Sequence, residues 1–270
     1  MSTPGLREAL VYGKMEGAVK ATLKLVPVIA LFSILFFTLR FFGRYVGYNV
    51  SVLVSDLGGL TYLYSTVGTI FAIFAGFVVV SESQDWNTLS AGSKNEVREL
   101  NELFVWSRRL SKPLAERFSM NIQKYLTVVI QKEWKSLEQG TESPEAEALV
   151  NEFHGLLAEA SKENPDIAYH MFTSFDEFMN NRATRIMYSW QPLPAILKFT
   201  VILVDVAVMG LSLFIGVKDM WLDYLFMVCI VTLGSVILMV VDDLDNPLRP
   251  GDWYLSSGEH QRLLRRIQPP

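Results

Sequence analysis

The chain has 270 residues, of which 50% are hydrophobic and 19% are charged, and its formal net charge is −4 at pH 7. Its mean hydropathy of +0.26 lies between that of a soluble enzyme and that of a bundle wholly embedded in lipid. The single cysteine, Cys229, excludes an intrachain disulfide and a cysteine-rich metal site. Basic residues are interleaved with acidic ones and form no basic face, so nucleic-acid binding is not predicted.

Four apolar stretches, arranged as two pairs, define the class of protein. Each is close to the roughly 20 residues that a helix needs to cross a bilayer, whereas barrel strands would be about half as long. Because every backbone amide inside lipid must find a partner within the chain, we predict an all-α fold with four transmembrane helices. The first stretch lacks a small-residue cleavage site and is interpreted as a retained helix. The stretches are Leu25–Phe42, Leu60–Val80, Pro194–Val217 and Leu222–Val241.

Lysine and arginine residues predict the orientation of these helices. Nearly all of them lie before the first stretch, after the last stretch, or in the long middle segment, whereas the two short connections hold only Arg44 and Lys218. Basic residues resist translocation, so both termini and the middle segment are expected to be cytoplasmic, in a multi-pass protein of a bacterial inner (plasma) membrane. The expected divisions are a cytoplasmic segment 1–24, a first transmembrane pair 25–80, a helical cytoplasmic domain 81–193, a second pair 194–241 and a cytoplasmic segment 242–270.

The middle segment is predicted to be helical, because its apolar residues follow helical spacing and no part of it alternates as a strand would. Prolines after Lys112, Ser143 and Asn164 mark the expected starts of helices that run to about residues 138, 160 and 190. A further helical pattern lies between Lys94 and Leu110, and its charged residues, such as Glu96 and Glu99, are expected to form a solvated helix surface. Each helix has one apolar face, so packing together or against other copies is expected, which favours a homo-oligomer.

Motifs for catalysis are absent from the sequence. His154, His170 and His260 are scattered, with no spacing that would build a transition-metal site. The chain also lacks a phosphate-binding glycine-rich loop and a nucleophile elbow. An enzyme is therefore not predicted, and no cofactor is expected other than calcium at the acidic residues that follow the fourth stretch.

The second apolar stretch changes character halfway along its length. Its first half is rich in hydroxyl groups and its second half is bulky and apolar. If several copies surrounded an axis, the first half would form a wetted vestibule and the second a hydrophobic constriction that gates by dewetting. The alternative is that the hydroxyls bond back to their own helix and the aromatic rings face lipid. The vestibule candidates are Tyr62, Thr66 and Thr69, with Asp56 and Glu82 flanking the helix, and the constriction candidates are Ile70, Ile73, Phe74 and Phe77.

Asp205 lies near the middle of the third stretch, where an unpaired carboxylate is costly, so it must face protein or water. Lys198 is on the same helix face but about 10 Å away along the axis, so a direct ion pair is not expected, and Lys198 is predicted to reach the cytoplasmic interface. Asp205 could serve as an ion or proton site on a transport path. Alternatively, it could be held neutral or hydrogen-bonded to hydroxyl groups.

Three carboxylates, Asp242, Asp243 and Asp245, follow the fourth stretch, where the helix dipole opposes negative charge. A cation should compensate them. Arg182 and Arg185 are candidates, and a bound calcium ion is a weaker one, because the cluster lacks the remainder of an EF-hand.

Three short motifs, in their order relative to the spans, resemble the bestrophin-like membrane protein family over most of the chain. They are Ser81–Trp86 leading into Glu96–Leu100, the Arg182-x-x-Arg185 spacing before Leu193-Pro194, and Leu244-Asp245-Asn246-Pro247-Leu248. In this family a Phe commonly follows the proline and a Gly follows closely, whereas here the residue is Leu248 and Gly251 comes later. The resemblance implies a distant similarity to bestrophins, which are pentameric anion channels with four spans and a pore lined by the second. Bestrophins also have a richer, calcium-binding acidic cluster after the fourth span.

The pattern and the resemblance together predict a homo-oligomeric, pentameric ion channel whose pore is lined by the second span. The lipid bilayer, inorganic ions and other copies of the chain are the expected partners. Acidic rings at Asp56 and Glu82 would favour cations, whereas the resemblance implies anions. Two alternatives remain open. One is a membrane-anchored interaction or signalling module without conduction, and the other is a small ion-coupled carrier that uses Asp205.

Overall fold

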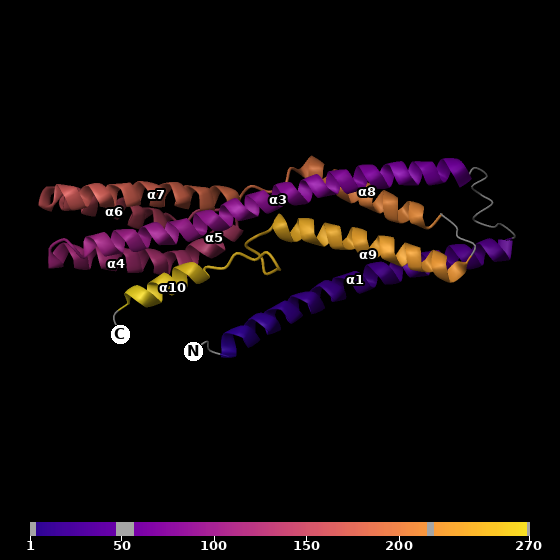
Figure 1. The fold of residues 1–270 in the computed structure, drawn as a ribbon, viewed down its shortest axis with the longest axis horizontal. Helices are drawn as coiled ribbons and strands as arrows, with labels where there is room; N and C mark the ends of the chain where they lie inside the picture. Colours follow the sequence, from indigo (N-terminus) through magenta and orange to yellow (C-terminus); the bar gives the residue numbers. More distant parts are fainter. Residues whose placement is uncertain (1–3, 47–56, 215–218, 269–270) are drawn as a thin grey trace. The chain divides into compact units, whose positions relative to one another are not determined.

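The computed structural model describes residues 4–46, 57–214 and 219–268 (Figure 1). These residues form helices joined by turns, and no strand occurs among them, which confirms the predicted all-α class. The chain divides into two compact units. The first unit comprises residues 1–82 and 193–245, and the second comprises residues 83–192 and 246–270.

The first unit contains the helices that are long and apolar enough to cross a membrane, in agreement with the four predicted spans. The third predicted span is shorter than expected, because its helix ends at Ser212, and the predicted end at Val217 lies outside the described residues. The helices are α1 (Pro4–Val46), the N-terminal part of α3 (Leu57–Ser107), α8 (Ala195–Ser212) and α9 (Met220–Leu244).

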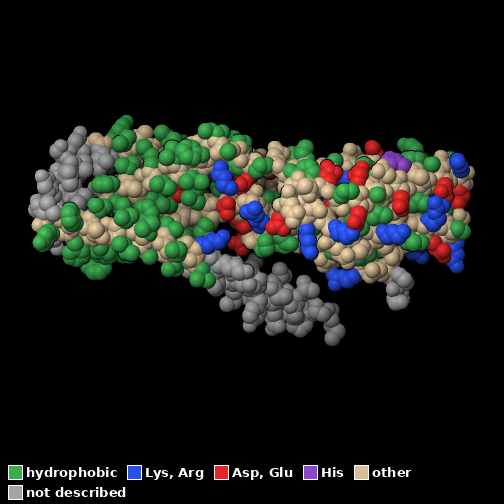
Figure 2. All heavy atoms as spheres, turned by 180° about the vertical axis from the view of Figure 1, so that it is seen from behind, with side chains coloured by type: hydrophobic (Ala, Val, Ile, Leu, Met, Phe, Trp, Pro, Cys, Tyr) green, Lys and Arg blue, Asp and Glu red, His purple; other side chains and the backbone are tan. Residues whose placement is uncertain are grey.

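Helix α9 organises the packing of the first unit, since it contacts both α1 and α8. One apolar cluster joins Phe36 of α1 to Met209 of α8 and Val231 of α9. A second cluster joins Phe71 and Val78 of α3 to α8 and α9. The outward surface is also apolar, as Figure 2 shows by the hydrophobic side chains that cover this part of the chain. Such faces suit lipid or neighbouring protein, neither of which penalises apolar contact.

The second unit is a bundle built from short helices and the C-terminal part of α3. Proline at the first turn begins α4, α6 and α7, as the sequence predicts. The Ser143 and Asn164 side chains cap α6 and α7 by accepting hydrogen bonds from the amides of Ala146 and Ile167. The elements are α4 (Lys112–Val128), the π-helical turn η1 (Val129–Glu133), α5 (Trp134–Glu138), α6 (Pro144–Glu163), α7 (Pro165–Ser189) and α10 (Gly258–Ile267).

A close approach of α3 and α7 shapes the core of the second unit. A side chain on Gly92 would meet Thr184 Cγ2 at 3.1 Å and the Asn181 carbonyl oxygen at 3.3 Å, so glycine permits this contact. The C-terminal segment is fastened to the bundle by two indoles. Trp86 donates to the Trp253 carbonyl at 2.6 Å, and Trp134 donates to the Leu255 carbonyl at 2.9 Å.

Candidate functional site

One face of α3 is uncovered along the first unit. In the isolated chain Tyr62 is 78% exposed, Ile73 is 70% exposed and Phe77 is 66% exposed. The opposite face, which carries Phe71 and Val78, is buried against α8 and α9. These alternating burial states follow the helical period, so the exposed residues form one continuous stripe. Thr66 and Thr69 are exposed on the same stripe.

The hydroxyl groups on this stripe bond to their own helix. Thr66 donates to the Tyr62 carbonyl at 2.9 Å, and Thr69 donates to the Ser65 carbonyl at 2.8 Å. This is the bonding that the alternative interpretation of the sequence expects. Each hydroxyl uses its only proton in this bond, so its oxygen lone pairs remain available on the exposed side of the helix.

The other predicted lining residues differ in their surroundings. Ile70 is 57% exposed, whereas Phe74 is partly buried and packs against the apolar cluster shared with α8 and α9. Glu82 is only 5% exposed and follows Val78 on the buried face, so its burial does not support a place on the stripe. Asp56 lies outside the described residues.

Asp205 is enclosed between α8 and α9. The residue is 1% exposed, and its Oδ2 atom is buried without a hydrogen-bond partner in the described part of the chain. Lys198 does not pair with it, as predicted from their separation along the helix. Instead, Lys198 Nζ lies 2.7 Å from Asp245 Oδ2 and 3.5 Å from Asp242 Oδ1.

Lys198 is therefore a cation of the acidic turn after α9. The two arginines that the sequence predicts for this role, Arg182 and Arg185, instead pair with Glu96, Glu133 and Glu147. Asp245 also accepts a hydrogen bond from the Leu193 backbone amide at 2.5 Å, which ties the start of α8 to the end of α9. Within the described ranges, no group of three or more His, Cys, Asp or Glu side chains is arranged to hold a metal ion.

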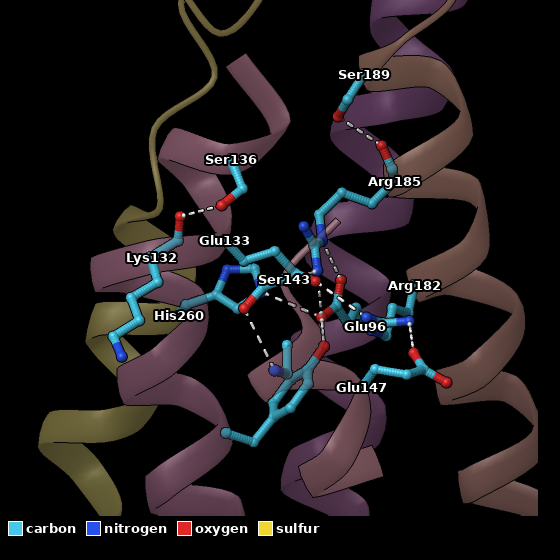
Figure 3. A network of polar contacts seen from close by, with 12 residues as sticks. Glu96, Lys132, Glu133, Ser136, Ser143, Glu147, Arg182, Arg185, Ser189 and His260 are labelled. Carbon is cyan, nitrogen blue, oxygen red and sulfur yellow. Dashed lines mark hydrogen bonds and ion pairs between the residues drawn. The ribbon is translucent and has the colours of Figure 1, made fainter. Parts of the chain in front are cut away.

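A buried polar network lies inside the second unit (Figure 3). Arg185 donates to Glu96 Oε2 at 2.5 Å and to Glu133 Oε2 at 2.7 Å, and Arg182 donates to Glu133 Oε1 at 3.0 Å. His260 Nε2 of α10 lies 3.5 Å from Glu96 Oε1. The π-helical turn ends at Glu133 and places this carboxylate in the interior.

The charged groups in this network shift one another's pKa values. Burial disfavours the ionised form of Glu96, but the positive charge of Arg185 and the adjacent His260 outweigh it and hold the Glu96 pKa well below its usual range. Burial raises the pKa of Tyr125, whose hydroxyl donates to Glu96 Oε1 at 2.6 Å, and the negative charge of Glu96 raises it further. The prediction that Glu96 and Glu99 lie on a solvated surface is wrong, since they are 0% and 8% exposed.

These features define an all-helical protein with four candidate membrane spans, an uncovered stripe on α3 and a buried ionic network. Residues 57–249, more than half of the chain, match the family described as the Bestrophin-like domain. The chain belongs to this family, as its short motifs predict. None of the curated proteins compared with the chain matches it.

Solved structures share the fold. A bacterial Bestrophin homolog from Klebsiella pneumoniae with a point substitution has a TM-score of 0.70 at 14% identity, covering 92% of this chain and 97% of the other. A second substituted form of the homolog has a TM-score of 0.59 at 14% identity, with coverage of 92% and 99%. A structure described as a membrane protein has a TM-score of 0.69 at 14% identity, with coverage of 93% and 99%.

Proposed function

We propose that the protein is an ion channel in which several copies, five according to the resemblance to bestrophins, surround an axis lined by α3. The observation that carries this proposal is the uncovered stripe of α3, where Tyr62, Thr66 and Thr69 are followed by Ile73 and Phe77. In the proposed assembly the first three residues form a wetted vestibule, and the last two form apolar rings. Water leaves a narrow apolar ring readily, so such rings oppose ion passage until they widen.

The burial pattern also supports an order among the constriction candidates. Ile73 and Phe77 are the most exposed, and Ile70 is exposed beside them. Phe74 lies at the edge of the stripe because it packs against the cluster shared with α8 and α9. We therefore infer that Ile73 and Phe77 form the narrowest rings, with Ile70 above them and Phe74 supporting the wall.

The proposal is tested by conductance of the purified full chain in vesicles. Replacing Ile73 or Phe77 with Ala removes a large side chain from the proposed rings, so leak conductance should rise, with smaller increases for Ile70→Ala and Phe74→Ala. Phe199→Ala is the matched control, because Phe199 is a similarly exposed phenylalanine on α8 and is 60% exposed. Unchanged conductance in all four α3 variants would exclude this lining. It would instead favour a membrane-anchored interaction module without conduction.

A further inference from the structure

Asp205 of α8 packs against Gly234 of α9. A methyl group on Gly234 would lie 2.2 Å from Asp205 Oδ1 and 2.7 Å from Met209 Cε, so a larger residue would displace the Asp205 carboxyl group and the end of the Met209 side chain. The carboxyl group is thus pressed against the backbone of α9. Its other oxygen, Oδ2, is buried and has no hydrogen-bond partner in the described residues.

Two basic side chains on the surrounding helices, Arg40 and Lys198, pair with other carboxylates. Lys198 of α8 is paired with Asp245, and Arg40 of α1 is paired with Asp223 of α9 at 2.5 Å. Asp223 precedes Gly234 by eleven residues, or about 16 Å along the helix. No hydrogen bond or ion pair joins any of these groups to Asp205 within the described ranges. The ionisable side chains on or beside the apolar parts of these helices include Lys24, Arg40, Tyr45, Tyr62, Tyr64, Glu82, Lys198, Asp223, Tyr224, Cys229, Asp242, Asp243 and Asp245.

An ionised Asp205 would be an uncompensated charge inside an apolar helix pair, which costs far more than a neutral carboxyl group at the same place. Binding of one proton removes the charge and supplies a hydrogen-bond donor. We propose that Asp205 is a proton-binding site of the α8–α9 pair, and that the bound proton permits the close packing of its carboxyl group against Gly234. Loss of the proton draws water to the carboxylate and loosens this contact.

The sign of the pH effect follows from this arrangement. The packed form of the helix pair binds a proton that the loosened form releases, so the packed form is favoured at low pH and weakened as pH rises. Asp205→Asn keeps the size of the side chain and remains neutral at every pH. The helix contact in this variant should therefore not respond to pH in the range where the wild-type contact does.

Labelling with the hydrophobic reagent dicyclohexylcarbodiimide tests the proton directly, and it requires no ion conduction. The reagent adds the O–H of a protonated carboxyl group across its C=N bond, and rearrangement leaves a stable N-acylurea adduct that peptide mass spectrometry locates. We expect the purified full chain in lipid vesicles to form the adduct at Asp205 at pH 7, with labelling that falls as pH rises. Asp242 is an internal control, because its side chain is 65% exposed. An exposed carboxylate is solvated in its ionised form and reacts poorly with this reagent, so labelling of Asp205 should clearly exceed that of Asp242 at pH 7.

A second variant, Gly234→Ala, tests the helix contact while the reactive carboxyl group of Asp205 is retained. Gly234→Ala places a methyl group against the carboxyl group, so it should open the contact, admit water and reduce labelling of Asp205 at pH 7 while Asp205 itself is retained. Absence of the Asp205 adduct at every pH in folded wild-type protein would overturn the proposal. Labelling of Asp205 no stronger than that of Asp242 would overturn it as well. Conductance measurements do not enter this test, so its failure is distinguishable from failure of the proposed channel.

Discussion

The buried network of the second unit makes a quantitative prediction for Arg185→Met. Arg185 is 0% exposed and joins Glu96 of α3 to Glu133 of η1. Methionine has similar length and removes the charge, which leaves Glu133 paired with Arg182 and leaves Glu96 beside Tyr125 and His260 without the arginine that it binds in the wild type. Breaking a buried ion pair on one side costs about 3–5 kcal/mol. For a domain of 150–250 residues each kcal/mol shifts the thermal midpoint by about 2–4 °C, so a decrease of about 6–20 °C is expected.

The assay is thermal unfolding of the full chain in detergent, followed by tryptophan fluorescence. Trp134 is a suitable reporter because the Arg185 guanidinium carbon lies 5.2 Å from the centre of its ring. Arg117→Met is the matched control, since Arg117 pairs with Glu159 on the surface and both side chains are about half exposed. This control should leave the midpoint close to that of the wild type.

A double variant separates loss of the pair from loss of packing. In Arg185→Met combined with Glu96→Gln, the buried carboxylate of Glu96 is also neutralised, so the combined loss should be smaller than the sum of the single losses. The reasoning would be refuted if folded Arg185→Met unfolded within about 2 °C of the wild type, less than the shift expected from 1 kcal/mol. Additive losses in the double variant would refute it too.

Three further predictions concern charge. The Glu96 pKa is depressed in the folded protein, so its contribution to stability is complete above the unfolded value of about 4.3 and is lost as pH falls through the folded value. Thermal unfolding should therefore show a steeper loss of stability below about pH 4 in the wild type than in Glu96→Gln. Lys198→Met should lower the free energy of unfolding by about 1–3 kcal/mol, because the Asp245 side chain is 6% exposed and loses its cation. Denaturant unfolding measures this loss, and Asp242→Asn, whose side chain is 65% exposed, should change the free energy little. The hydroxyl oxygens of Thr66 and Thr69 keep lone pairs on the exposed side of the helix, and these favour cations in the proposed vestibule. The reversal potential measured across a salt gradient should therefore lie near the equilibrium potential of the cation. A reversal potential near that of the anion would contradict this prediction.

The spans and the helical class were predictable because they depend on local properties of the sequence. Apolar length decides whether a segment can cross lipid, and proline with a capping residue decides where α6 and α7 begin. The stripe on α3 was predictable for the same reason, since helical periodicity alone places Ile73 and Phe77 on one face. Only the described structure could show that Phe74 packs against the cluster shared with α8 and α9 and that Glu82 is buried.

The buried charges were not predictable, because their partners are distant in the sequence. Glu96 and Arg185 are separated by 89 positions, and a charged residue on an amphipathic helix normally faces solvent. The phase of η1 adds a second difficulty, since a π-helical turn changes which side of the helix Glu133 faces, and nothing in its local sequence marks this turn. The pairing of Lys198 with Asp245 was not predictable either, because it depends on how α8 and α9 pack.

Single-channel recording of a cysteine variant tests the proposed pore most directly. Thr69→Cys, in a Cys229→Ser background, places a thiol on the exposed stripe of α3 and removes the natural one. The proposed channel predicts a measurable current that changes when a charged, water-soluble thiol reagent is added, while the same reagent has no effect on Phe199→Cys. Absence of current in the assembled protein, or a response at position 199 but not at position 69, would contradict a pore lined by α3.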